Sequence, residues 1–513
     1  MNTTYRLTHL LLFLLTLAAS AAMAADNPPI LTPPAPLTPR INGPSVFGVR
    51  PGSPFLYTIP ATGERPIQFS VDHLPKGLCL EVATGRIMGE LKSKGEIKLV
   101  LRARNTHGTA EKKFRIICGD RIALTPPMGW NSWNCWAEAV DQDKVLRSAR
   151  SMVASGLINH GWTYINIDDT WQGKRGGPFG GLQSNEKFPD MKQLCHEIHA
   201  MGLKAGIYST PWITSYAKFA GGSSDSSDGR WDKTMADAKF WRHGKFPFAN
   251  ADARQWAAWG FDYLKYDWNP NDVPHVAEMS KALRRCKRDI IYSLSNSAPF
   301  AHAADWAKWA NCWRTTGDIW DHWNENSAEW QYGISEIGFI QERWAPFAAP
   351  GHWNDPDMLV LGYVGWGPKL HQTRLTPNQQ YSHISMWCML SAPLLIGCDM
   401  DRLDPFTLNL LSNDEVLAIN QDALGRQAVR VGANGAVDIY LKDLEDGSKA
   451  LGFFNRSTAE ETVIYNKLGR VGLSGKQHVR DLWRQKDLAD VKDSVKVTVP
   501  AHGVVLLKLT AAK

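Results

Sequence analysis

The hydrophobic pattern predicts a β-rich segment at the start of the chain, over residues 27–120. Two stretches are apolar at alternate positions, namely Ile97, Leu99, Leu101 and Ala103 in the first and Phe114, Ile116 and Cys118 in the second. A period of two is typical of half-buried strands, so this segment is predicted to be a small β-sandwich. The prolines between Pro28 and Pro39 predict an extended leader before it.

The middle of the chain, residues 121–425, alternates short apolar segments with amphipathic ones. Strands are predicted at 128–130, 164–167, 205–208, 263–266, 290–293, 313–314, 358–360 and 393–396, and helices at 142–155, 188–201, 251–259, 275–286, 327–342 and 378–390. Eight β/α repeats in about 300 residues predict an α/β fold, a closed (β/α)8 TIM barrel. An open doubly wound sheet is the competing topology, but it usually has a Gly-rich turn after its first strand, unlike the Trp130-Asn131-Ser132-Trp133 segment found here.

The last part, residues 426–513, returns to strands. Apolar runs at 437–441, 450–454 and 504–509 are separated by Gly, Asn and Asp turns. They predict a C-terminal antiparallel β-domain.

Residues 1–24 have the pattern of a signal peptide. Arg6 is the one formal charge before Asp26, an apolar run covers 10–19, and Ala22-Met23-Ala24 offers the small residues of a cleavage site. Cleavage after Ala24 or Ala25 is expected, which makes the protein exported, either periplasmic or secreted. An uncleaved anchor is the alternative, although the apolar run is shorter than the about 20 residues that span a bilayer. No membrane contact is expected once the segment has been removed.

Composition narrows the function. The 513 residues contain 57 Lys and Arg against 51 Asp and Glu, a net charge of +6 without basic runs, so neither nucleic acid nor an anionic membrane is predicted as a partner. The eight Cys contain no CxxC pair and are expected to be buried thiols or isolated bridges. Of 22 Trp, 21 lie between Trp130 and Trp387, so the middle part is chemically distinct.

Polar residues gather where the predicted barrel strands end, which is where barrel enzymes place their active sites. The candidates are Asp168, Asp169, Lys265, Asp267, Arg314, Asp318, Asp355 and Asp357, accompanied by Trp130, Trp133, Trp171, Tyr208, Trp212 and Trp268. Carboxylates with aromatic rings suit a neutral sugar, because hydroxyls donate to carboxylates and C–H faces pack on rings. Each Asp alone could be a turn or helix cap, and Asp168-Asp169, or His352 with Asp355 and Asp357, could hold a metal. No HxH or HxxxH spacing supports a metal centre, and no cofactor or metal is predicted.

Five motifs carry a resemblance to a known family. They are the segments 125–133 (TPPMGWNSW), 165–171 (INIDDTW), 263–267 (YLKYD), 353–359 (WNDPDML) and 419–425 (INQDALG). Together they resemble glycoside hydrolase family 27, the melibiase or α-galactosidase family, over about residues 121–510. Segments 74–78 and 84–89 resemble the immunoglobulin-like (Ig-like) modules of bacterial secreted hydrolases, for which a structural or spacing role is expected.

The resemblance implies a retaining exo-α-galactosidase that needs no cofactor and acts on α-galactoside oligosaccharides or polysaccharides. It places Asp267 as the nucleophile and Asp318 as the acid/base. The implied substrate-binding residues are Trp133, Asp168, Asp169, Tyr208, Lys265, Ser295, Ala298, Arg314, Asp357 and Met358. In typical retaining enzymes the two carboxyl groups lie about 5–5.5 Å apart. Lys265 is expected to keep Asp267 ionised, and burial near like charge is expected to keep Asp318 partly neutral.

Two departures from the family pattern leave alternatives open. Many family members have, two residues after the nucleophile, a Cys that forms a disulfide, whereas Asn269 stands here. Where α-galactosidases usually have Cys-Glu-Trp, this chain has Ser293-Leu294-Ser295-Asn296-Ser297-Ala298, and small residues at Ser295 and Ala298 are similar to the α-N-acetylgalactosaminidase branch. That activity is the alternative within the family, with Asn296 as a candidate acceptor near position 2. A non-catalytic glycan-binding protein is the alternative outside it.

Overall fold

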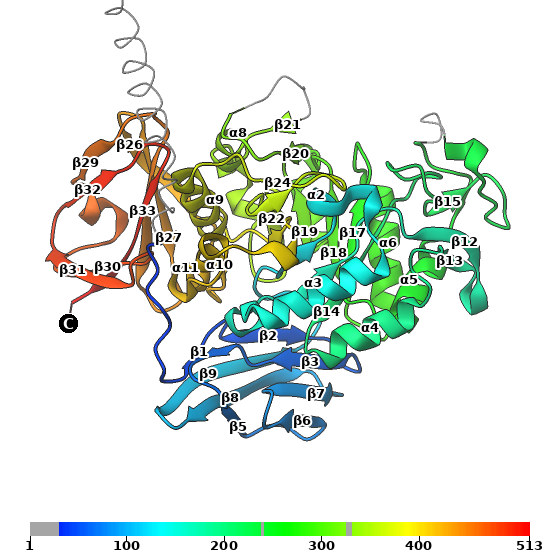
Figure 1. Cartoon of the computed structure of the whole chain (residues 1–513), viewed down its shortest axis with the longest axis horizontal. Helices are drawn as coiled ribbons and strands as arrows, with labels where there is room; N and C mark the ends of the chain where they lie inside the picture. The colour runs from blue at the N-terminus through cyan, green and yellow to red at the C-terminus, as the bar shows by residue number, and fades with distance from the viewer. Residues whose placement is uncertain (1–29, 237–240, 325–330, 513) are drawn as a thin grey trace, which may run out of the picture.

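The computed structural model describes residues 30–236, 241–324 and 331–512. The predicted signal peptide, 1–24, lies outside the described residues. Figure 1 shows three parts: a central barrel, an N-terminal β-domain below it and a C-terminal β-domain at its side. The prediction of a (β/α)8 barrel flanked by two β-domains is confirmed.

The N-terminal domain is a β-sandwich. Its strands are β1 (Arg40–Ile41), β2 (Val46–Val49), β3 (Pro54–Thr58), β4 (Ala61–Thr62), β5 (Gln68–Asp72), β6 (Leu78–Glu81), β7 (Arg86–Glu90), β8 (Gly95–Asn105) and β9 (Gly108–Cys118). One sheet has the order β2-β9-β8-β5 and the other β3-β7-β6, with β1 paired to β4. The alternation predicted at 97–118 is present, because Leu99, Leu101, Phe114 and Ile116 are all buried in the core between the sheets.

The barrel sheet contains eight parallel strands. They are β10 (Met128–Asn131), β11 (Tyr164–Asn166), β14 (Lys204–Ser209), β17 (Tyr263–Asp267), β18 (Ile291–Ser295), β19 (Cys312–Arg314), β22 (Trp353–Asp355) and β25 (Leu394–Ile396), in the order β22-β19-β18-β17-β14-β11-β10-β25. A parallel bridge between Leu359 and Ile396 links the segment after β22 to β25. That bridge closes the barrel.

The seventh strand was predicted at 358–360 and is found at Trp353–Asp355. The chain turns at Asp357, whose φ is 86°, so the apolar run that follows does not continue the strand. Leu359 of this run makes the closing bridge instead. The prediction therefore found the right apolar segment but assigned it the wrong role.

Helices pack around the barrel (Figure 1). They are α2 (Trp133–Trp136), α3 (Gln142–Ala154), α4 (Met191–Ala200), α5 (Ala249–Trp259), α6 (Val273–Arg285), α7 (Ala303–Trp309), α8 (Ile334–Gly338), α9 (Pro377–Met389), α10 (Pro405–Leu411) and α11 (Asp414–Asn420). Side chains of Asp141, Asp190 and Asp272 cap the N-termini of α3, α4 and α6, which explains where these helices begin. The helix predicted at 327–342 is wrong in length, since only α8 and a 3-10 turn at Glu342–Phe347 form there in the described part.

Short strand pairs lie in the loops that follow the barrel strands. They are β12 (Gln172–Gly176) with β13 (Gly181–Ser184), β15 (Ser223–Ser224) with β16 (Phe246–Pro247), β20 (Asp318–Ile319) with β21 (Gln331–Tyr332), and β23 (Tyr363–Val364) with β24 (His371–Gln372). Their positions follow the barrel strands in sequence, so they build the rim above the strand ends.

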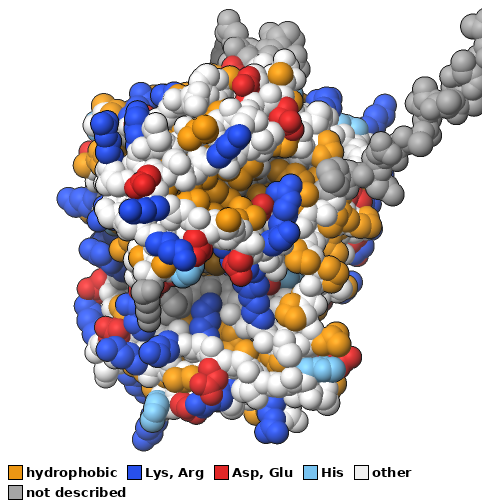
Figure 2. Space-filling model, turned by 90° about the vertical axis from the view of Figure 1, so that its left-hand side faces the viewer, with side chains coloured by type: hydrophobic (Ala, Val, Ile, Leu, Met, Phe, Trp, Pro, Cys, Tyr) orange, Lys and Arg blue, Asp and Glu red, His pale blue; other side chains and the backbone are white. Residues whose placement is uncertain are grey.

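The C-terminal domain is antiparallel, as predicted. Its strands are β26 (Val429–Asn434), β27 (Val437–Asp443), β28 (Lys449–Asn455), β29 (Glu461–Tyr465), β30 (Gln477–Asp481), β31 (Lys486–Val491), β32 (Val495–Val499) and β33 (Val504–Ala511). Six form one sheet and β29 pairs with β32. Figure 2 shows Lys and Arg side chains with Asp and Glu side chains interspersed among them on this side of the molecule.

Partly buried contacts join the Ig-like domain to the base of the barrel. Arg50 pairs with Asp289 at 2.5 Å, and the Ser53 hydroxyl accepts from the Asp289 backbone N–H at 2.7 Å. The described part of the leader also packs, since the Leu31 N–H donates to the Tyr381 hydroxyl at 3.1 Å. Within the described ranges, no helix has both the length and the apolar character needed to cross a bilayer. All eight cysteines are free thiols.

Candidate active site

Strand β17 presents Lys265 and Asp267 at the mouth of the barrel. Residues two apart on a strand point to the same face, so both side chains are directed to the same place. Asp267 ends the strand and is 6% exposed. The Lys265 ammonium donates to Oδ2 of Asp168 at 2.7 Å, and Asp168 lies at the start of the loop after β11, two strands away in the sheet. The structure thus brings three of the predicted residues together.

Asp168 and Asp169 are both buried but have different surroundings. Asp168 is held by Lys265 and by its backbone N–H, which donates to the Ser132 hydroxyl at 3.0 Å. Asp169 accepts from the Gln172 amide at 2.8 Å and from the Ala217 N–H at 2.9 Å. Burial raises the pKa of Asp169, while these hydrogen bonds lower it. Sugar hydroxyls would donate to the lone pairs of Asp169 that these protein donors leave free.

A second network surrounds Arg314, at the end of β19. Its Nη2 lies 2.8 Å from Oδ2 of Asp357 and 3.1 Å from Oδ1 of Asp318. The Ile319 N–H also donates to Asp357, at 2.9 Å, so this carboxylate is fixed from two sides. Arg314, Lys265, Asp357, Ser295 and Met358 line one cavity.

The surroundings of the two presumed catalytic carboxyls differ from the prediction. Burial raises the pKa of Asp267 to about 7, and the attraction of Lys265 only opposes that rise. Asp318 was expected to be buried, but 47% of its side chain is exposed and it is paired with Arg314. This prediction was wrong because Asp318 lies on β20, in the rim, while Asp267 ends a strand of the barrel wall.

The end of β18 carries the residues near the presumed position 2 of the sugar. Ser295 and Ala298 are 2% and 3% exposed. The amide of Asn296, which lies between them, donates to Oδ1 of Asp267 at 2.5 Å. Sequence reasoning offered Asn296 as a sugar acceptor but missed this contact, since the contact depends on how two neighbouring strands are paired.

The apolar candidates also gather. Met358 belongs to a small hydrophobic cluster against which Trp133 packs. The Tyr208 hydroxyl is buried and has no hydrogen-bond partner among the described residues. A buried hydroxyl without a hydrogen-bond partner costs free energy. A bound ligand that supplied a partner would remove this cost.

Backbone strain is concentrated in the same turns. Thr170, Asn296 and Asp357 have φ values of 84°, 68° and 86°, in the left-handed region that non-glycine residues rarely adopt. Such residues cost about 1–3 kcal/mol each and cluster at functional sites. The three turns follow β11, β18 and β22.

An aromatic wall, formed by Trp212, Tyr216 and Trp241, was not predicted as a unit. It lies in the long loop after β14, and its ring centroids are 5.2–6.3 Å apart. Burial and the charges of Asp267 and Asp318 raise the pKa of Tyr216, so the Tyr216 hydroxyl lies within electrostatic range of both carboxyls. Of its members only Trp212 was a sequence candidate, because the loop has no periodic pattern.

Comparison with known proteins decides the family. A family model described as alpha galactosidase A matches residues 125–240 and 233–422, and its C-terminal beta sandwich model matches 434–509. The chain belongs to the α-galactosidase family, glycoside hydrolase family 27. An Ig domain model also matches, at residues 38–118.

Individual family members cover most of the chain. Alpha-galactosidase 2 of Arabidopsis thaliana is 35% identical over 411 residues, which is 78% of this chain and 93% of that protein. Alpha-galactosidase A of Cellvibrio japonicus is 33% identical over 418 residues, 76% of this chain and 93% of that one. A solved Bacteroides fragilis structure, assigned as an α-galactosidase, is 34% identical with a TM-score of 0.82 and covers 94% of this chain and 99% of its own.

Proposed function

We propose that this protein hydrolyses terminal non-reducing α-D-galactosyl residues by double displacement, with retention of configuration. The observation that carries the proposal is the pair of networks at the barrel mouth. One joins Lys265 to Asp168 beside Asp267, and the other joins Arg314 to Asp318 and Asp357. Membership in the α-galactosidase family gives the substrate class.

The first displacement forms a covalent intermediate. A carboxylate oxygen of Asp267 attacks the anomeric carbon, and the bond to the glycosidic oxygen breaks as the carboxyl proton of Asp318 moves to that oxygen. The leaving alcohol departs, and galactose stays bonded to Asp267. Arg314 then faces the carboxylate of Asp318 and stabilises its charge.

The second displacement releases galactose. Asp318 takes a proton from a water molecule, the water oxygen attacks the anomeric carbon, and the bond to Asp267 breaks. The two inversions give net retention. The Lys265–Asp168 pair and Asp169 supply hydrogen-bonding groups for sugar hydroxyls, while Trp133 and Met358 provide an apolar surface for the C–H face.

Initial rates on p-nitrophenyl glycosides test the activity. We expect hydrolysis of the α-galactoside and none of the β-galactoside, with the α-anomer of galactose appearing first in an NMR time course. Asp267→Asn should lower turnover by about a thousandfold or more, because no neighbour replaces a covalent nucleophile. Binding of galactose by calorimetry without hydrolysis would instead indicate a sugar-binding protein.

A second activity is favoured by one observation. Ser295 and Ala298, both buried at the end of β18, are small, and space at this place suits a 2-acetamido group. α-N-acetylgalactosaminidase activity is therefore the second candidate. Including p-nitrophenyl α-N-acetylgalactosaminide in the rate comparison separates the two, since preference for it would reassign the substrate and leave the mechanism unchanged.

Export is part of the proposal and rests on the sequence pattern of residues 1–24. Residues 22–24 would place the cut after Ala24 or Ala25. N-terminal sequencing of the protein from cell fractions tests this, and a mature chain that begins at Ala25 or Asp26 is expected. A chain that retains Met1 would contradict cleavage.

A further inference from the structure

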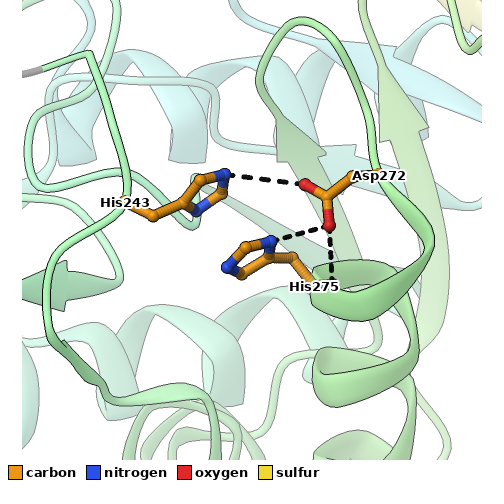
Figure 3. Close-up of side chains that lie close together, drawn as sticks. All are labelled: His243, Asp272 and His275. Atoms are coloured by element: carbon orange, nitrogen blue, oxygen red, sulfur yellow. Dashed lines mark hydrogen bonds and ion pairs between the residues drawn. The ribbon is translucent and has the colours of Figure 1, made fainter.

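His243, Asp272 and His275 form a compact group in the loops that follow β14 and β17, here called the His–Asp–His cluster. Figure 3 shows both imidazoles turned toward the carboxylate, with His243 on a loop and the other two at the start of α6. Nδ1 of His275 lies 2.7 Å from Oδ1 of Asp272, and Nε2 of His243 lies 3.5 Å from Oδ2. One ligand atom from each residue lies within 4.8 Å of the other two. Within the described ranges, this is the one such group of three His, Cys, Asp or Glu side chains.

The cluster contains more than a helix cap requires. Asp272 caps α6 by accepting the His275 N–H at 3.0 Å, which occupies a single oxygen. Its other oxygen also accepts from the Trp268 indole, at 3.2 Å. Nδ1 of His243 is buried and has no hydrogen-bond partner in the described part of the chain. Capping alone therefore does not explain why two imidazoles converge on this carboxylate.

The ligand types and spacings fit a zinc-class ion. Two imidazole nitrogens and one carboxylate oxygen are a common donor set for Zn²⁺. With bonds of about 2.0–2.1 Å, neighbouring tetrahedral ligand atoms lie roughly 3.3 Å apart. The separations in the structure, 2.7 Å from His275 to Oδ1 of Asp272 and 3.5 Å from His243 to its Oδ2, lie on either side of that value, each to a different oxygen. The imidazole rings are stacked, with centroids 3.5 Å apart and planes 7° from parallel, so both must turn about χ2 for their lone pairs to converge. This torsion is soft in histidine.

The cluster opens onto a cleft that leaves room for a fourth ligand. His243, His275 and Glu278 line the cleft together with Tyr266 and Lys245. Glu278 lies three residues after His275 on α6, which places it on the same helix face. Either this carboxylate or a water molecule can complete four-fold coordination.

We propose that the His–Asp–His cluster binds a zinc-class divalent cation, which ties the loop after β14 to the loop that follows Asp267. The place is significant because many family members have a disulfide-forming Cys two residues after the nucleophile. This chain has Asn269 there, and Asp272 is three residues further on. The ion acts as a structural clip and takes no part in bond cleavage.

The loop that the ion would hold carries the aromatic wall. Trp212 forms a backbone β-bridge with His243, so fixing this histidine also holds the backbone that carries the indole. Trp212 in turn packs on Tyr216 and Trp241. Metal binding therefore stabilises the rim that faces the two presumed catalytic carboxyls.

Calorimetric titration of Zn²⁺ into the full-length protein, free of any polyhistidine tag and stripped with a chelator, tests the proposal. We expect one ion per chain, with affinity at least about tenfold lower in His243→Ala and in His275→Ala. His478→Ala is the matched control, because His478 pairs with Asp490 at 2.8 Å without a second histidine. This control should bind zinc as the unaltered protein does.

Two further measurements on the unaltered protein do not depend on variants folding. Co²⁺ should give the visible absorption of a tetrahedral site, and Zn²⁺ should raise the unfolding midpoint. Lack of binding by the unaltered protein, or full binding by both variants, would overturn the proposal. Equal loss of binding in the His478→Ala control would overturn it as well, since the ion would then not be specific to the cluster.

Discussion

The side-chain amide of Asn296 donates a 2.5 Å hydrogen bond to Oδ1 of Asp267. The Asp267 carboxyl is buried, and this burial raises its pKa to about 7. The amide N–H therefore donates to a carboxyl that burial disfavours in its ionised form. A hydrogen bond to the ionised form lowers a carboxyl pKa, so the Asn296 amide favours the ionised form of Asp267. In the proposed mechanism, Asn296 is therefore a positioning residue that acts through Asp267.

The first prediction concerns the pH profile. In the free enzyme Asp267 must be ionised to attack, so kcat/KM on p-nitrophenyl α-galactoside should fall as pH drops below about 7. Asn296→Ala should move this acid limb upward by about one pH unit and lower kcat/KM at pH 6 by roughly tenfold. A merely structural role would reduce activity equally at every pH and leave the limb where it is.

The second prediction links the same carboxyl to stability. Its pKa is raised from 3.8 to about 7, so the folded state binds this proton more tightly than the unfolded state. The stability contributed by the protonated group is present below pH 4 and is lost as pH rises through 7. Asp267→Asn, which cannot ionise, should therefore increase the free energy of unfolding by roughly 2–4 kcal/mol at pH 8 and little at pH 4. Denaturant unfolding at both pH values measures this. A gain of equal size at pH 4 would show that ionisation is not the cause.

The sequence predicted the architecture well because strand and helix periods are local. Seven of the eight barrel strands overlap their predicted positions, and the polar strand ends identified Lys265 and Asp168, which the structure brings together. The seventh strand was misplaced because Asp357 adopts a left-handed backbone conformation, which nothing in the local sequence predicts. The predicted burial of Asp318 was wrong because the exposure of a rim side chain depends on contacts between residues that are far apart in the sequence. The aromatic wall lies within one long loop and the His–Asp–His cluster joins two loops, and neither loop sequence has a hydrophobic period from which these contacts could be predicted.

The third prediction concerns the group at position 2 of the sugar. Ala298 is 3% exposed, and its N–H donates to the Arg314 carbonyl at 2.8 Å, so its side chain is fixed close to the Arg314 strand. Ala298→Leu should reduce kcat/KM on the α-N-acetylgalactosaminide by at least about tenfold and on the α-galactoside by less than about threefold. Ala301→Leu, on an exposed turn nearby, is the control and should leave both rates unchanged. Equal losses on both substrates would mean that Ala298 does not select the 2-substituent.

The fourth prediction concerns the Ig-like domain. Besides Asp289, the Arg50 guanidinium donates to the backbone carbonyls of Arg284, Cys286 and Arg288 at the base of the barrel. Arg50→Ala leaves these partly buried acceptors unpaired, so it should lower the free energy of unfolding by about 2–3 kcal/mol. The contact lies at the N-terminal ends of the barrel strands, and the active site lies at their C-terminal ends, so kcat should stay unchanged. Lys94→Ala, which breaks the exposed Lys94–Asp120 pair, is the control and should leave the unfolding midpoint unchanged. Similar midpoints for both variants would show that the domain does not brace the barrel.

The last prediction tests what the aromatic wall recognises. Trp241 is 38% exposed, its ring is nearly parallel to that of Trp212, and its indole N–H donates to the Ser215 carbonyl at 3.1 Å. A half-exposed ring held in this way offers a flat face to a sugar unit beyond the cleaved bond, and such stacking is worth about 1 kcal/mol. Trp241→Ala should therefore raise KM roughly fivefold for an α-galactosyl trisaccharide and leave the KM of p-nitrophenyl α-galactoside nearly unchanged. Trp309→Ala, at the end of α7 on the outside of the barrel, controls for the general effect of removing a half-buried indole. If both substrates lost affinity equally in Trp241→Ala, the wall would serve to shape the galactose pocket rather than to bind the leaving group.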